Sequence, residues 1–476
     1  MQYLFYDLET TGLCESFDQV VRFAAIRTDA NFNEIDQFEI DIKLRPDIVP
    51  SPYALIVTHL SIDDIVQGTC EYDALVQIHK IFNTPNQINI GYNSLSFDNI
   101  MLRFGFYRNL LDPYSHQYKN NTFRADAMCM NLIYYLYKND VIKWTESRPI
   151  KLENINQENK YVDGASHDAM IDVKVMLSLC KVLHSYDDKM WNYLISGFIK
   201  TNDLARLEKL PTIDIGDKNY KIGIYTDIAL GYDINCCCVA LCLGRHSEYK
   251  NQSLWMRLDY DNISNYFLDD EKNPRIMKRK DGEPCFILPW NKSYDHVLDN
   301  ERKDYVNDNL EWLHKNSDKL QDFIDSKLND KYDKIDNLDI DSSIYDQGLF
   351  KSDELIDIRK FHEASISDKI NLLDSISSKR VHSLSARILF RNFSHELEDS
   401  LKDKIKQSIA SSQYVNTKQQ QRRTPIDGLK EVNKILSKEE LDQTQSDIVS
   451  DYAVSYTHLR AHETKANLVC RLLREK

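Results

Sequence analysis

Two carboxylates stand inside an apolar run close to the N-terminus. The segment "LFYDLETTGL" (4–13) reads as a buried strand, yet it carries Asp7 and Glu9. Side chains two residues apart point to the same face of a strand, so these two carboxylates lie side by side. Burying like charges without partners costs several kcal/mol. Either the strand end is exposed to water, or a cation lies between the two side chains.

Composition narrows the class of protein. The 476 residues suffice for about two to four domains, and a hydrophobic content of 42% allows large cores. We see neither a basic, apolar leader nor a run long enough to span a bilayer, so no membrane association is expected. The ten cysteines follow no disulfide or zinc spacing, which fits a reducing cytoplasm. A net charge of −14 argues against a uniformly basic nucleic-acid coat but leaves room for a local basic groove.

Local patterns predict an α/β part, then a β part, then a helical part. Three strand-like runs before residue 46 predict an antiparallel meander, and a short strand is expected at 88–93. Helical patterns cover 53–66, 72–82, 124–137 and a stretch after residue 167. Short β runs between 219 and 290 suggest a small barrel or sandwich, and the chain after 300 is charged and helical. The end, 454–476, resembles the translation of a sequencing adapter, and we exclude it as non-native.

Three further polar residues stand at strand ends or helix starts. Asp98 follows a strand and a turn, His167 precedes a helix, and Asp172 lies near the start of that helix. Taken singly, each fits an ordinary role as a polar or charged residue of a helix N-terminus or surface. Together with Asp7 and Glu9 they form a set of four carboxylates and one histidine. Carboxylates without thiolates suit hard cations such as Mg²⁺ or Mn²⁺, and such a cation would offset the repulsion between the first two.

The order and spacing of these residues resemble the three exonuclease motifs of the DEDD superfamily. The matching segments are "FYDLETTGL", "GYNSLSFDNIML" and "HDAMID", and the His-x-x-x-x-Asp ending marks the histidine branch. The resemblance implies two metal ions about 4 Å apart that clamp the scissile phosphate. It assigns Asp7, Glu9, Asp98 and Asp172 to the metals and His167 to the role of general base.

Longer segments are similar to the bacterial exodeoxyribonuclease I family. The similarity is carried by "RFAAIRTD", "GYNSLSFD", "FYRNLLDPY" and "SHDAMIDV", and more weakly by "LFRNF". It implies an α/β ribonuclease-H-like exonuclease domain, a mixed sheet with flanking helices, at 1–188. An SH3-like β domain with a helical extension would follow at 189–345, and a mostly helical domain at 346–453. Together the three domains would close around single-stranded DNA.

The same resemblance supplies candidates for binding the DNA strand, namely Glu9, Arg103, Tyr114, Tyr118 and Lys151. Aromatic rings that stack on bases, interleaved with cations that bind phosphates, hold a single strand without sequence preference. The alternative is that the two tyrosines only pack in a core. Lys151 stands where the family usually has arginine, so it keeps the charge but loses the bidentate fork. Two basic runs, 275–280 and the "QQQRR" that contains Arg422, are either solvated faces or a rim facing DNA.

The resemblance implies a 3′→5′ exonuclease that degrades single-stranded DNA to 5′-mononucleotides in DNA repair and recombination. Two Mg²⁺ ions would serve as cofactors, with Mn²⁺ as a substitute. The expected partners are single-stranded DNA and single-stranded DNA-binding protein, and the protein would act as a cytoplasmic monomer. Two alternatives remain open: a non-catalytic nucleic-acid-binding or scaffold protein on a nuclease fold, and an RNA-directed exonuclease of the same superfamily.

Overall fold

A computed structural model describes residues 1–163, 168–268, 275–283, 285–331, 333–410, 413–438 and 440–457. The chain folds into two compact units. Unit 1 comprises Met1–Phe123, Asp163–Lys174 and Ile335–Lys476, and unit 2 comprises Arg124–Val162 and Val175–Lys334. Residues 1–123 and the described residues from 335 to 457 therefore belong to one unit. The domain boundaries expected after residues 188 and 345 stay a prediction.

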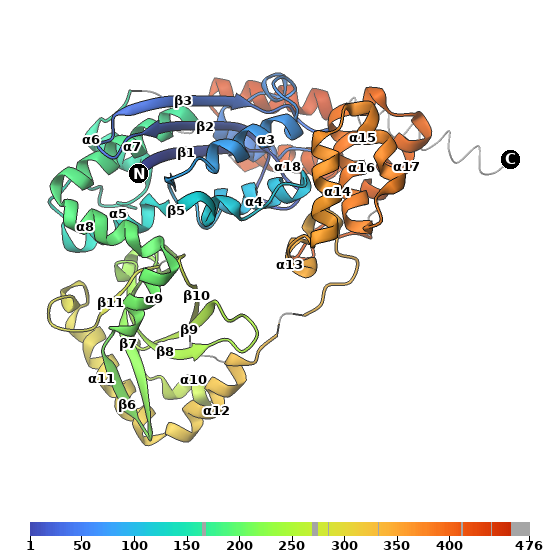
Figure 1. Cartoon of the computed structure of the whole chain (residues 1–476). Helices are drawn as coiled ribbons and strands as arrows, with labels where there is room; N and C mark the ends of the chain where they lie inside the picture. Colours follow the sequence, from blue (N-terminus) through green and yellow to red (C-terminus); the bar gives the residue numbers. More distant parts are fainter. Residues whose placement is uncertain are drawn as a thin grey trace. The chain divides into compact units, whose positions relative to one another are not determined.

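The sheet of unit 1 is mixed (Figure 1). Its strands are β1 (Gln2–Thr10), β2 (Val20–Thr28), β3 (Glu34–Asp41), β4 (Gln87–Gly91) and β5 (Phe123–Asp126), in the order β3-β2-β1-β4-β5, and the boundary of the unit falls inside β5. The first three strands form an antiparallel meander, whereas β1 and β4 run parallel. The predicted meander and the mixed sheet are confirmed.

The two faces of β1 have different surroundings. Leu4, Tyr6 and Leu8 enter a core with helices α3 (Glu71–Phe82) and α4 (Asp98–Arg108). On the other face, the rings of Tyr3 and Phe5 lie 5.1 and 6.1 Å from that of Phe32. Because side chains alternate along a strand, Asp7 and Glu9 continue this second face toward the end of β1. The period of the strand thus separates the carboxylates from the core under α3 and α4.

The helix expected at 53–66 is interrupted. It consists of α1 (Pro52–Thr58) and α2 (Ile62–Ile65), because His59 adopts a left-handed φ of 54° that ends α1. Ser61 then begins α2 with a capping box, in which its side chain accepts the backbone N–H of Asp64. The prediction of one continuous helix is therefore wrong.

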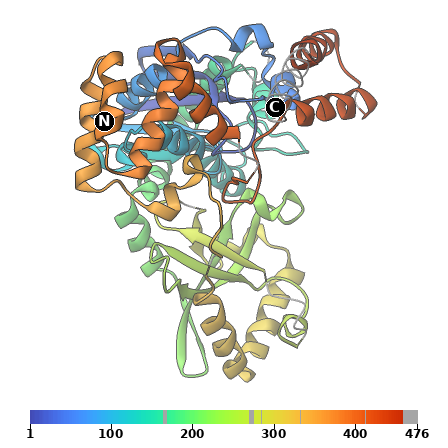
Figure 2. The ribbon, with the colours of Figure 1, turned by 90° about the vertical axis from the view of Figure 1, so that its right-hand side faces the viewer.

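The C-terminal residues of unit 1 are helical (Figure 2). The helices are α13 (Ile344–Gln347), α14 (Ser352–Glu363), α15 (Ile366–Leu372), α16 (Lys379–Phe393), α17 (Asp399–Ala410), α18 (Pro425–Lys438) and a last one at 443–457. Phe361, Leu384 and Leu389 share one core with Tyr72 and Phe104 of the N-terminal part. A second core joins α1 to α18. The mostly helical C-terminal region is confirmed, and it packs directly on the helices beside the sheet.

A buried ionic network reinforces this packing. The guanidinium of Arg391 donates to Asp47 at 2.8 Å and to Asp341 at 2.5 Å, and all three side chains are almost inaccessible to water. Arg422 also bonds to Asp341, at 2.5 Å. Although burial opposes it, Arg387, Arg391 and Arg422 hold the pKa of Asp341 well below its usual value. These charges connect residues some 340 positions apart in sequence.

Unit 2 combines helices with an antiparallel sheet. The helices are α5 (Ala127–Tyr137), α6 (Leu152–Asn159), most of α7 (Ala169–Tyr186), α8 (Asp188–Ile195), α9 (Lys200–Glu208), α10 (Ser264–Leu268), α11 (Asn300–Lys315) and α12 (Ser317–Leu328). The strands are β6 (Thr212–Ile215), β7 (Lys218–Thr226), β8 (Cys237–Arg245), β9 (Gln252–Arg257), β10 (Ile276–Lys280) and β11 (Ile287–Pro289), in the order β10-β9-β8-β7-β11 with β6 beside β7. The run of short strands predicted between 219 and 290 is confirmed. Its assignment to an SH3-like class stays a prediction.

The cysteines of the described residues are free thiols. Cys238 lies in the core of the β sheet of unit 2, where it behaves as a small apolar side chain. Across the described ranges, no helix has both the length and the apolar character needed to cross a membrane.

Candidate active site

Four of the five predicted catalytic residues act on one another electrostatically. Burial, and then the charges of Asp98, Glu9 and Asp172, raise the pKa of Asp7 well above its usual value. Burial, Asp172 and Asp98 likewise raise the pKa of Glu9 to about 9. When no cation is bound, the ionised carboxylates of this cluster therefore repel one another, and the fold keeps them close in spite of that repulsion.

Each carboxylate of the cluster comes from the end of an element. Asp7 and Glu9 lie near the end of β1, and a register shift follows directly between Glu9 and Thr10. Bulges of this kind often re-aim side chains beside active sites. Asp98 is the first residue of α4 and is 7% exposed. Its neighbour Asn99 donates to the hydroxyl of Tyr6 at 3.0 Å, which ties the start of α4 to β1.

Asp172 lies in the first turn of α7, and the residue that fixes this turn was not predicted. The carboxylate of Asp168 accepts the backbone N–H groups of Met170 and Ile171 at 3.0 and 3.1 Å, and its carbonyl accepts that of Asp172 at 2.9 Å. Its charge also raises the pKa of Asp7 and of Glu9. The signal in the sequence was an aspartate at the N-terminal cap of the helix, directly after His167. The predicted general base, His167, lies outside the described residues.

The loop after β1 is closed by its own polar groups and by the C-terminal part of unit 1. Asp18 accepts the hydroxyl of Thr11 at 3.0 Å and the backbone N–H of Cys14 at 2.8 Å. A Cβ at Gly12 would come within 2.5 Å of the Asp18 carboxylate, so only glycine fits there. We call residues 413–424 the strap, because they lie along this loop. Its contacts are Asn416 to the Cys14 sulfur (3.2 Å), Lys418 to Glu15 (2.7 Å), Arg422 over the Phe17 ring (4.3 Å) and Arg423 to Asp18 (3.8 Å).

Some residues of the two basic runs singled out in the sequence serve internal contacts, whereas Arg275, Lys278 and Lys280 are exposed. Arg422 belongs to the strap and to the ionic network, and Arg279 is 2% exposed and pairs with Asp203. Arg275 donates to the carbonyl of Ala229 at 3.0 Å. For Arg279 and Arg422, both earlier interpretations, a solvated face and a rim facing DNA, are therefore wrong.

The predicted strand-binding residues have different surroundings. Arg103 is 4% exposed, donates to the Tyr345 hydroxyl at 2.8 Å and stacks over the Tyr114 ring at 5.0 Å. Tyr118 is 61% exposed, so its ring is open to a base. Lys151 belongs to unit 2, where its exposed side chain forms an ion pair with Glu153. The structure thus brings Arg103 and Tyr114 together and leaves Tyr118 accessible.

The donor set fits a hard divalent cation. Its members offer carboxylate oxygens and no sulfur, and a bound cation would counteract the burial and the neighbouring charges that raise the pKa of Asp7 and of Glu9. Within the described ranges, no group of three or more His, Cys, Asp or Glu side chains is arranged to hold a metal ion as it stands.

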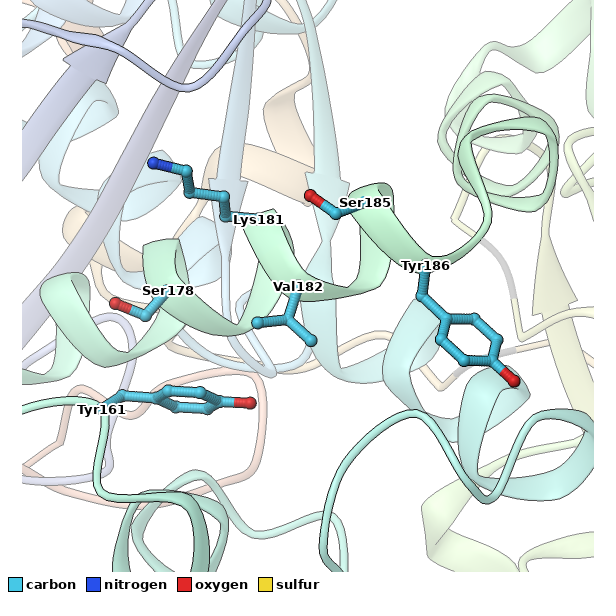
Figure 3. A pocket seen from close by; sticks show the side chains of 6 residues that line it. All are labelled: Tyr161, Ser178, Lys181, Val182, Ser185 and Tyr186. Atoms are coloured by element: carbon cyan, nitrogen blue, oxygen red, sulfur yellow. The ribbon is translucent and has the colours of Figure 1, made fainter.

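A separate cleft lies on α7 in unit 2 (Figure 3). It is lined by Tyr161, Ser178, Lys181, Val182, Ser185 and Tyr186. None of these lining residues is a carboxylate or a histidine, so this lining offers no strong ligand for a divalent metal ion. The carboxylate cluster of unit 1 remains the candidate active site.

Comparisons with known proteins indicate the class of protein that this chain resembles. Residues 4–180 match the family described as "Exonuclease". A segment of 218 residues, 44% of the chain, is 33% identical to exodeoxyribonuclease I of Buchnera aphidicola (Schizaphis graminum), and 212 residues, 43% of the chain, are 30% identical to that of Escherichia coli K12. These segments span 44% and 45% of the relatives' own length. Residues 4–180 thus resemble an exonuclease domain, and the mixed sheet of unit 1 lies almost entirely within this match.

The particular resemblance is to bacterial exodeoxyribonuclease I. The zinc-bound complex of the E. coli enzyme with single-stranded DNA shares the fold over 96% of this chain and 99% of its own, with a TM-score of 0.79 and 20% identity. A complex of single-stranded DNA-binding protein, exonuclease I and an inhibitor matches with a TM-score of 0.77 over the same shares, also at 20% identity. The family resemblance that the motifs predicted is confirmed in sequence and in fold.

Proposed function

We propose that this protein is a metal-dependent 3′→5′ exonuclease that degrades single-stranded DNA to 5′-mononucleotides in DNA repair and recombination. One observation carries the proposal: carboxylates from β1, α4 and α7 lie close enough that burial, together with the charges of Asp98 and Asp172, raises the pKa of Asp7 and of Glu9. A chain without catalytic duty gains nothing from such repulsion. The likeness to exodeoxyribonuclease I supports the same activity.

In this proposal Asp7, Glu9, Asp98 and Asp172 hold two Mg²⁺ ions, with Mn²⁺ as a substitute. Bound divalent ions supply positive charge at the scissile phosphate and lower the pKa of water. His167 accepts the proton of the attacking water as general base. Asp168 fixes the first turn of α7, so it keeps Asp172 in place.

The substrate is bound by stacking and by charge. The exposed ring of Tyr118 offers a face to a base, and Lys151 offers a cation to a phosphate. The guanidinium of Arg103 stacks on the ring of Tyr114. In this proposal the two side chains therefore contact the DNA strand together. Glu9 would contact the terminal nucleotide as well as the metal. Single-stranded DNA-binding protein is the proposed partner of a cytoplasmic monomer, and the free thiols fit a reducing compartment.

Digestion of matched, uniformly labelled DNA and RNA oligomers tests the proposal. Single- and double-stranded forms are incubated with and without Mg²⁺, and the products are separated by length. We expect 5′-mononucleotides from single-stranded DNA with Mg²⁺ only. Preferential loss of RNA would point to an RNA-directed enzyme, and binding of DNA without cleavage would point to a scaffold; either result contradicts the proposal.

Two variants and one control locate the activity. Asp7→Asn removes a metal ligand and should abolish cleavage. His167→Ala should lower the rate by roughly 10²–10⁴-fold while metal binding is retained. Glu39→Gln changes an exposed carboxylate of β3 in the same sheet and should cleave like the parent. Loss of metal binding in the histidine variant would make His167 a ligand instead of a base.

A further inference from the structure

Three charged residues of neighbouring strands stand in one row. Glu9 on β1 is paired in register with Arg22 on β2, and Arg22 is paired in register with Asp41 on β3. Residues directly opposite each other on antiparallel strands project to the same face of the sheet. The row Glu9–Arg22–Asp41 therefore places a guanidinium between a carboxylate of the candidate metal site and a carboxylate of the outer strand.

Arg22 is held on the outer side of this row. Its Nε donates to the Asp41 carboxylate at 2.7 Å, and its side chain is 30% exposed. It also acts on the cluster, because it opposes the effects of burial, Asp172 and Asp98 on the Glu9 carboxyl. Asp168 and Glu9 in turn stabilise its charge. Arg22 is thus a fixed cation beside the candidate metal ligands and is not itself a ligand.

We propose that Arg22 is a positioning residue that sets the affinity of the carboxylate cluster for divalent ions, and that Asp41 determines how strongly it does so. This inference rests on the proposed function, because it assumes that Glu9 binds metal. A fixed positive charge next to the site repels an incoming cation and so weakens its binding. Asp41 holds the guanidinium away from Glu9. When Asp41 is neutralised, Arg22 can pair with Glu9 directly and compete with the metal.

The two halves of the row therefore predict opposite effects on metal binding. Titration of the DNA-free, full-length protein with Mn²⁺ by calorimetry is the measurement. Arg22→Gln should bind Mn²⁺ about three- to tenfold more tightly, since a unit charge near a divalent ion matters even in a high dielectric. Asp41→Asn should bind Mn²⁺ about threefold more weakly, because Arg22 can then pair with Glu9 and compete with the ion. Arg22→Lys, which restores the charge, should return close to the parent affinity.

Arg27→Gln is the matched control. Arg27 lies on the same strand, five residues on and hence on the opposite face, and it also pairs with an aspartate of β3, Asp36. The control has the same change in net charge as Arg22→Gln, so a bulk charge effect would shift both variants equally. We expect its Mn²⁺ affinity to stay within about twofold of the parent.

The inference is overturned if Arg22→Gln binds Mn²⁺ no more tightly than the parent, or if Arg27→Gln gains as much. Should Arg22→Gln fail to fold, Asp41→Asn decides alone, and an unchanged affinity in that variant refutes the role of the row. The proposed function fails separately: a parent that binds Mn²⁺ but leaves DNA intact is not an exonuclease, whereas the affinity differences would still stand.

Discussion

Replacing Arg391 by methionine tests whether buried charge holds the C-terminal helices against the N-terminal part of unit 1. Arg391 lies on α16, and its guanidinium bonds to Asp47 of the N-terminal part and to Asp341 ahead of α13. The side chains of these three residues are 1%, 4% and 0% exposed. Methionine retains most of the aliphatic volume, so the change removes the charge and opens little cavity.

The structure sets the expected size of the effect. Removing one partner of a buried ion pair costs about 3–5 kcal/mol, because the other charge stays buried without compensation. Here the compensation is only partly lost: Asp341 keeps Arg422 at 2.5 Å and Arg387 at 3.0 Å, and Asp47 keeps Arg45 at 3.3 Å. We therefore expect the lower end of the range, a loss of about 3 kcal/mol in the free energy of unfolding of unit 1.

The tryptophans make the assay specific. All five, at positions 144, 191, 255, 290 and 312, belong to unit 2, so tryptophan fluorescence reports the unfolding of unit 2. Hydrogen exchange of peptides from α4 and α16 reports unit 1. Arg391→Met should speed exchange in these peptides and leave the midpoint of the fluorescence transition in urea close to that of the parent.

Lys430→Met is the control, because it breaks an exposed pair with Asp427 on α18 of the same unit. Its cost should stay below about 0.5 kcal/mol. If Arg391→Met lowers the free energy of unfolding by less than about 1 kcal/mol, the attraction within the network only offsets the cost of removing its charges from water. That result would refute the reasoning from buried charge.

Three other outcomes follow from the same structure. Burial would raise the pKa of Glu71, but Arg45 and Arg108 lower it from 4.5 to about 2, so this residue contributes stability above pH 4.5 that is lost as the pH falls toward about 2. The amount is about 3 kcal/mol, and urea titrations across this window should show a smaller loss for Glu71→Gln. The pKa of Glu9 is raised from 4.5 to about 9, so the stability of the metal-free protein should fall as the pH rises between these values. Thermal melts in EDTA should show Asp7→Asn to be more stable than the parent, whereas equal melts would mean that the carboxylates do not repel each other. Finally, a chain ending at Lys334 should be insoluble or unfolded, as judged by gel filtration and circular dichroism, and a monomeric, active product would contradict the assignment of residues 335–457 to the nuclease unit.

Local patterns were enough to predict β1 to β4 and four carboxylates of the candidate site, but β5 (Phe123–Asp126) was read as the start of the helix predicted at 124–137, which begins only at Ala127. A continuous apolar and aromatic run predicted β1, and two acids inside it indicated the cluster because charge in a buried strand is costly. The helix predicted at 72–82 corresponds to α3 (Glu71–Phe82), and Asp98 begins α4 as its place after a strand and a turn suggested. Each of these features depends on residues that are neighbours in sequence.

What escaped prediction depends on register or on distant contacts. Arg22 joins the site only because β2 is paired so that it stands opposite Glu9, and the apolar pattern of β2 does not reveal that pairing. The basic residues of the strap looked like solvated charges, since their partners Phe17 and Asp18 lie some 400 positions earlier. His59 ended α1 inside a pattern that was periodic throughout, because a single left-handed residue leaves little trace in the sequence.

The same distant contacts lead us to expect that the first 188 residues alone do not form a complete folding unit. Tyr72 and Phe104, on the helices that cover the sheet, lie in one core with Phe361 and Leu384, so their apolar surfaces would face water without α14 and α16. Without the C-terminal residues, Asp47 would also lose its ion pairs with Arg391 and Arg422. The loop that follows Glu9 would lose the strap. Because a metal site requires its ligands to be fixed closely, we infer that the C-terminal helices maintain the geometry of the catalytic cluster although they contribute no carboxylate to it.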